Sequence, residues 1–252
     1  MLTLTRGRME GFEGIALANF ELSLADHVCE FTPKHAELLG REGVLRVVRY
    51  GIDRAARHGF DGHEPLRLFL EMIFLLGSEF DTDPQYPWAG EILGDAASPS
   101  QDERAAKLYS KLKEFLDLVA GPENEFAIAA LRRAKEVKIA DALAGGKGSE
   151  ESLLSLMAAI YPEKFGYVGK PAVQALLREA AAAVRPFAPT LPGVVLFSGL
   201  MFTLGHGFMN DPQHPWIQGT LANEAVADPN KRVERLHSKA MTYLDRVLEY
   251  LG

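Results

Sequence analysis

The stretch LRLFLEMIFLLGSEFDTDPQYPWAGEIL, residues 66–93, returns in diverged form as VVLFSGLMFTLGHGFMNDPQHPWIQGTL, residues 194–221. The two stretches align without a gap and share 12 of 28 residues, whereas average residue usage would give about two by chance. Each contains the loop Asp-Pro-Gln-(Tyr/His)-Pro-Trp, and together the two loops use both tryptophans of the chain. We therefore expect two diverged copies of one structural unit.

The similarity continues on both sides of these stretches. Downstream, seven further identities keep the offset of 128 residues, and upstream the offset becomes 129, as in Gly40 and Gly169. The predicted organisation is a first copy at residues 1–121, a linking helix with a glycine-rich linker at 122–149, and a second copy at 150–252. We expect the two copies to pack as one compact unit.

Each copy is predicted to be helical. Apolar residues recur at helical spacing in Glu42–Arg57, Gln101–Ala120 and Pro229–Leu251. The nearly continuous apolar runs Glu64–Ser78 and Gly193–Gly205 are too long for strands, and each contains a glycine suited to ending a helix. The predicted fold class is all-α, with two tandem repeats of about five helices each, related by a pseudo-two-fold axis.

Composition narrows the possible partners and compartments. A net charge of -7 supplies no basic footprint for nucleic acid. A single cysteine, Cys29, excludes an internal disulfide and fits a reducing cytoplasm. No signal peptide is visible, and the apolar runs are too short and too interrupted to span a bilayer. The oligomeric state stays open.

The shared loop is predicted to form a rigid corner. Pro84 fixes its own φ and disfavours helical angles at Asp83, whose carboxylate can then accept N–H groups of the next turn. Pro87 suits the first position of a short helix that ends at Leu93. Trp88 would fold back as an apolar plug. Every shared residue thus has a structural reason to be present.

A second interpretation is that the two corners form a site for a ligand or a partner protein. Loops on a rigid scaffold often carry recognition, and exposed Trp and Tyr are effective anchors. The candidate binding residues are Asp83, Gln85, Tyr86, Trp88, His206, Asp211, Gln213, His214 and Trp216.

No catalytic or cofactor signature stands out, and no cofactor is expected. A metal site remains an alternative, because the second copy carries three histidines where the first has serine and tyrosines. Three histidines and a carboxylate could ligate zinc or iron. The residues of that alternative are His206, His214, His237 and Asp211.

The sequence favours a non-catalytic protein-binding module, such as an adaptor, a chaperone or a toxin-neutralising (immunity-type) protein. Its acidic balance suits a basic partner. The alternative is a metal-dependent enzyme or small-ligand binder, with a site between the repeats near Asp83 and His214. Because the copies differ at Tyr86 and His214, and at Ser78 and His206, any site is expected to be asymmetric and to lie in the second copy.

Overall fold

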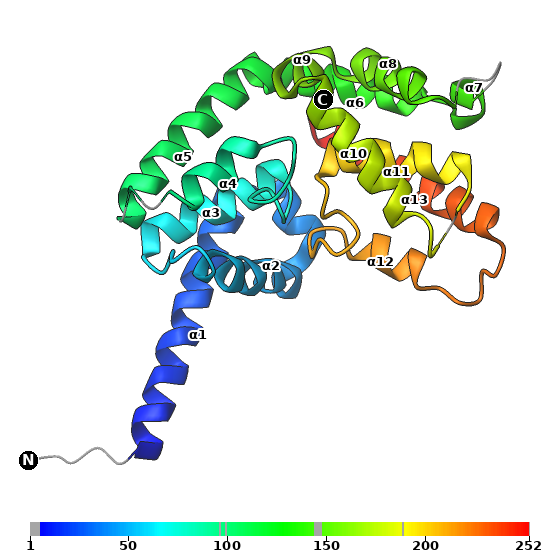
Figure 1. Ribbon diagram of the computed structural model, residues 1–252. Helices are drawn as coiled ribbons and strands as arrows, with labels where there is room; N and C mark the ends of the chain where they lie inside the picture. The colour runs from blue at the N-terminus through cyan, green and yellow to red at the C-terminus, as the bar shows by residue number, and fades with distance from the viewer. Residues whose placement is uncertain (1–5, 96, 99, 144–147, 188, 252) are drawn as a thin grey trace, which may run out of the picture. The chain divides into compact units, whose positions relative to one another are not determined.

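The computed structural model describes residues 6–95, 97, 98, 100–143, 148–187 and 189–251, and within these ranges the regular structure is helical with no strand (Figure 1). The all-α prediction is therefore confirmed. Residues 145–147 of the predicted glycine-rich linker lie outside the described residues.

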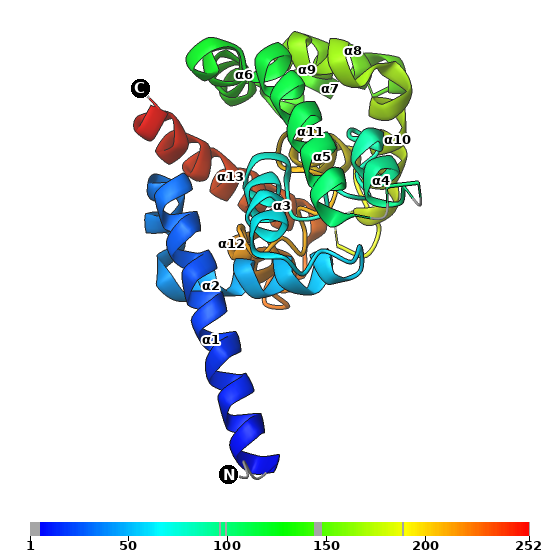
Figure 2. The same ribbon diagram turned by 90° about the vertical axis from the view of Figure 1, so that its left-hand side faces the viewer.

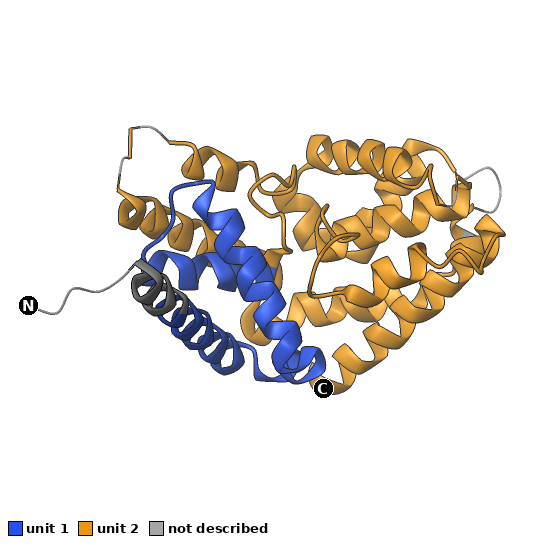
Figure 3. Ribbon diagram, turned by 90° about the horizontal axis from the view of Figure 1, so that it is seen from below, with its two compact units in different colours: residues 1–75 blue, residues 76–252 orange. Residues whose placement is uncertain are grey.

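Internal contacts divide the chain into two compact units, residues 1–75 and 76–252 (Figure 3). The boundaries predicted near residues 121 and 149 were drawn from sequence similarity, which is a different criterion, and they stay a prediction.

Unit 1 is built from α1 (Arg6–Phe31), α2 (Pro33–Ala56) and most of α3 (His63–Leu76). Helix α1 packs along α2. Helix α2 begins at a proline, and Gly40 with φ +67° interrupts its helical backbone. The helices meet through fully buried aliphatic and aromatic side chains: Leu24, Val44, Val47, Phe69 and Leu70.

Unit 2 contains the remaining helices (Figures 1 and 2). They are α4 (Pro87–Leu93), α5 (Gln101–Phe115), the π-helical turn η1 (Leu116–Ala120), the short 3-10 turn η2 (Pro122–Asn124), α6 (Glu125–Glu136), α7 (Ile139–Leu143), α8 (Glu150–Ile160), α9 (Pro162–Val168), α10 (Lys170–Ala183), α11 (Leu191–Leu204), α12 (Pro215–Leu221) and α13 (Pro229–Leu251).

Helix α11 is the centre of unit 2, as its continuous apolar sequence predicts. It packs against α7, α8, α10 and α13. Phe197 and Phe202 are buried on it, and Phe208 of the following loop meets Phe197 edge to face at 5.3 Å. Thr190 caps its first turn by accepting the N–H of Gly193.

Two predicted helices are divided in the structure. The segment Gln101–Ala120 is α-helical only to Phe115, after which the chain widens into the π-turn η1 and ends at Gly121, whose φ is +74°. The predicted linking helix becomes η2, α6 and α7. Asn124, with φ +62°, precedes α6, and Val137, extended with ψ +118°, ends it. The break redirects the chain between α6 and α7.

Candidate functional site

The loops that follow α3 and α11 meet backbone to backbone. Gly77 and Gly205 have φ of +103° and +96°, values that side chains rarely adopt. A Cβ at Gly77 would lie 2.4 Å from the carbonyl oxygen of Leu204, and one at Gly205 would lie 2.9 Å from that of Leu76. Both positions therefore require glycine.

Each loop aspartate bonds to the backbone of the other loop. Asp83 Oδ2 accepts the N–H of His206 at 2.8 Å, and Asp211 Oδ2 accepts the N–H of Ser78 at 3.1 Å. Positions 78 and 206 are themselves 128 residues apart, so the two hydrogen bonds are reciprocal. They fasten the loops to each other.

Each aspartate also organises its own loop. Asp83 Oδ1 accepts the N–H of Gln85 at 2.8 Å, and Asp211 Oδ1 accepts that of Gln213 at 2.8 Å. The two glutamine amides donate back to the same carboxylates. Burial raises the pKa of Asp211, while the bonds from Gln213 and Ser78 oppose that rise.

The predicted site residues lie mostly in the interior. Tyr86 is 2% exposed and packs edge to face on Phe115, while His214 is 4% exposed and packs on Tyr243. Trp88, Trp216 and His206 are partly buried, and the remaining members of the set are buried: Asp83, Gln85, Asp211 and Gln213. The side chains of the two corners are thus mostly buried, and their role in binding stays a prediction.

A buried lysine next to the corners was not anticipated from the sequence. Lys164 donates from Nζ to the carbonyl oxygen of Phe202 at 2.6 Å and lies 5.5 Å from the ring centre of Tyr86. Burial lowers the pKa of Lys164 to about 8, an effect that the charge of Asp83 partly offsets. Nothing in the sequence around residue 164 distinguishes this lysine from one on the surface.

The histidines of the metal alternative have different surroundings. His206 lies 3.1 Å from Thr82 Oγ1 and 3.2 Å from a carboxylate oxygen of Glu179. His214 is packed among aromatic rings, and burial lowers its pKa to about 4. His237 lines a cavity, and burial lowers its pKa too. Among the described residues, no group of three or more His, Cys, Asp or Glu is arranged to hold a metal ion.

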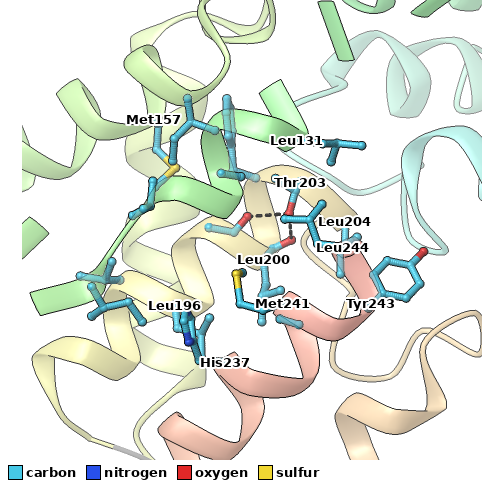
Figure 4. Close-up of a pocket in the computed structure, with 18 of the residues that line it drawn as sticks. Leu131, Met157, Leu196, Leu200, Thr203, Leu204, His237, Met241, Tyr243 and Leu244 are labelled. Atoms are coloured by element: carbon cyan, nitrogen blue, oxygen red, sulfur yellow. Dashed lines mark hydrogen bonds between the residues drawn. The ribbon is translucent and has the colours of Figure 1, made fainter. Parts of the chain in front are cut away.

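The cavity that His237 lines lies within unit 2 (Figure 4). Its volume is about 280 Å³, and helices α6, α7, α8, α11, α12 and α13 contribute to its wall. The lining side chains are aliphatic, thioether or aromatic, with Thr203 and His237 as polar exceptions, and no charged acid, lysine or arginine is among them. Prominent members of the wall are Leu131, Met157, Leu196, Leu200, Leu204, Met241 and Leu244.

Few polar atoms of the wall are available to a ligand. The hydroxyl of Thr203 already donates to the carbonyl oxygen of Gly199 at 2.8 Å. Burial raises the pKa of Tyr243 to about 12, so its phenol is neutral at pH 7. The indole Nε1 of Trp216 is buried and has no hydrogen-bond partner within the described part of the chain. A Cβ placed on Gly199 would meet nothing within 4 Å, so this face of α11 has free space.

No protein-family model, no curated protein and no solved structure matches this chain. In the part of the chain that the structure describes, no helix is both long enough and apolar enough to cross a membrane.

Proposed function

We propose that this protein is a non-catalytic binding protein that holds a small apolar molecule in the cavity of unit 2. The observation that carries the proposal is the cavity itself, about 280 Å³ with an almost wholly apolar wall. An engineered apolar cavity of roughly 150 Å³ is enough to bind benzene. A site nearly twice that size suits a ligand somewhat larger than one aromatic ring.

The chemistry of the wall favours an apolar occupant over water. A buried water needs two to four polar partners, whereas the cavity offers very few polar atoms. Met157 and Met241 give the wall adaptable surfaces that can adjust to a ligand. His237 is the single imidazole of the wall, and one such group without a nucleophile supports binding rather than a reaction.

We also infer that the chain consists of two diverged copies, as its sequence predicts. The breaks at Gly40 and Gly169 have φ of +67° and +81°, and α3 and α11 are both 14 residues long. The reciprocal bonds of Asp83 and Asp211 support the same relation. The cavity, however, is lined only by the second copy and the segment between the copies.

The differences between matching positions support an asymmetric site. Where the cavity wall has Thr203, His237 and Met241, the residues 128 positions earlier are Leu75, Tyr109 and Lys113. Tyr109 is 59% exposed. At these three positions the first copy lacks the side chains that line the cavity.

Protein binding, the function predicted from the sequence, is a second candidate. Helix α1 carries the apolar side chains Ile15, Leu17 and Leu22 at 60%, 54% and 41% exposure. Exposed apolar groups on one helix are typical anchors for a partner. If this candidate is correct, Leu17→Lys will release a co-purifying partner without changing ligand binding in unit 2; retention of that partner by the variant would exclude the α1 surface.

The ligand proposal is tested by titrating the full chain with N-phenyl-1-naphthylamine, a neutral dye whose fluorescence rises in apolar surroundings. We expect saturable binding at one site. Gly199→Phe should fill the free space beside α11 and weaken dye binding at least about tenfold. The substitution also replaces glycine in a helix interior, which favours the fold.

The matched control is Gly219→Phe on α12. Like Gly199, Gly219 lies in a helix, and a Cβ there meets nothing within 4 Å. Unlike Gly199, it is exposed and does not line the cavity. We expect this variant to bind the dye like the wild type. Equal binding by wild type and Gly199→Phe would reject the cavity as the site.

A further inference from the structure

We propose that the ligand of this cavity is a small amphiphile with one carboxylate, whose aliphatic chain occupies the apolar wall and whose carboxylate binds His237. This inference rests on the proposed function and adds the chemical class of the ligand.

His237 places a polar imidazole in an otherwise mostly apolar wall. It lies on α13, is partly buried, and lines the cavity together with Leu196 and Met241 (Figure 4). Among the described residues no hydrogen bond, ion pair or ring contact involves the imidazole of His237. An imidazole always carries at least one N–H donor, so this side chain offers an unused hydrogen bond at the cavity.

The wall offers no ionised acceptor to a ligand. The proton of Thr203 is already directed to Gly199. No Asp or Glu lines the cavity, so a cationic ligand would be buried without a counter-charge, which is strongly unfavourable.

A carboxylate ligand, by contrast, finds a hydrogen-bond donor in the wall at His237. A carboxylate can accept a hydrogen bond from the imidazole N–H of His237, and because the acceptor is ionised this bond is charge-assisted. Such bonds are about twice as strong as those between neutral groups. A neutral alcohol of the same length would gain only the weaker hydrogen bond.

The rest of the wall favours an aliphatic chain as the apolar part of the ligand. Leu196, Leu200, Leu204 and Leu244 with Met241 present flexible aliphatic surface, which follows the shape of a chain more readily than that of a rigid ring system. The position matching His237, Tyr109, is 59% exposed. The helical scaffold therefore does not require a half-buried imidazole at this position.

The inference is tested by displacing N-phenyl-1-naphthylamine with octanoate and with 1-octanol at pH 7. The proteins compared are the wild type, His237→Leu and the control Tyr109→Leu. In the wild type and in Tyr109→Leu, octanoate should displace the dye better than octanol. In His237→Leu the affinity for octanoate should fall about tenfold or more, while that for octanol stays the same or rises.

The possible outcomes separate the two proposals. Dye binding that persists in His237→Leu shows that the cavity has kept its shape. If octanol competes as well as octanoate in the wild type, or if His237→Leu leaves their ratio unchanged, the carboxylate inference is overturned and the cavity proposal stands. If the dye and both competitors fail to bind the wild type, the proposed function itself is overturned.

Discussion

Replacing His214 with tyrosine, the residue found 128 positions earlier, should flatten the dependence of stability on pH between 7 and 5. His214 is 4% exposed and is surrounded by the rings of Trp216 and Tyr243. Burial lowers its pKa to about 4 from an ordinary value near 6.5. The neutral imidazole is therefore strongly preferred in the folded state.

The sign and the size follow from proton linkage. Above pH 6.5 the imidazole is neutral in both states, and the free energy of unfolding is unaffected by its titration. As the pH falls below 6.5, the unfolded chain binds the proton first, so stability is lost until the pH reaches about 4. At pH 5 the loss covers about 1.5 pH units at 1.36 kcal/mol each, or about 2 kcal/mol.

The assay is urea unfolding at pH 7, 6 and 5 for the wild type, His214→Tyr and His214→Gln. The wild type should lose about 2 kcal/mol more than either variant over this range. The two replacements differ in volume, and agreement between them separates loss of titration from altered packing. Wild-type pH dependence in both variants would refute the assignment of a buried neutral imidazole at position 214.

Two further predictions concern the corners. Gly77→Ala and Gly205→Ala should each lower the free energy of unfolding by about 2–4 kcal/mol, because φ near +100° and a backbone oxygen within 3 Å both oppose a Cβ. The control Gly219→Ala, with open space around its Cβ, should be neutral or stabilising. Equal effects of the three substitutions in thermal unfolding would contradict the close backbone approach of the two loops. Lys164 has its pKa lowered to about 8, so the folded chain releases this proton before the unfolded chain does, and stability should rise by about 1.4 kcal/mol from pH 7 to pH 9. Lys164→Met should lack this rise in urea unfolding, and an unchanged rise in the variant would show that Lys164 is not the source.

The sequence predicted the helices and the corners well, because both depend on local chemistry. Helices α4 (Pro87–Leu93) and α13 (Pro229–Leu251) have the predicted bounds, since a proline begins each of them. The structural role of Asp83 follows from the Asp-Pro pair. Its partner, the N–H of His206, does not, because a contact across 123 residues has no local signature.

The cavity lay beyond sequence reasoning for a physical reason. Leucines such as Leu196 and Leu244 show by their spacing that a helix face is buried, but not whether the facing helices fill the space between them. Gly199 and His237 also have ordinary structural explanations when taken alone. Because the copies differ in their histidines, the sequence predicted a site in the second copy, and this stays a prediction.

The most direct test of ligand binding in the cavity is a methyl NMR spectrum of the chain labelled with ¹³C at its methionine methyl groups, recorded during titration with N-phenyl-1-naphthylamine. The chain has seven methionines, of which Met157 and Met241 line the cavity, while Met72 and Met209 lie elsewhere. We predict saturable shifts of the Met157 and Met241 signals, with those of Met72 and Met209 nearly unchanged. Dye binding that leaves the signals of Met157 and Met241 unmoved would contradict a ligand site between α8, α11 and α13.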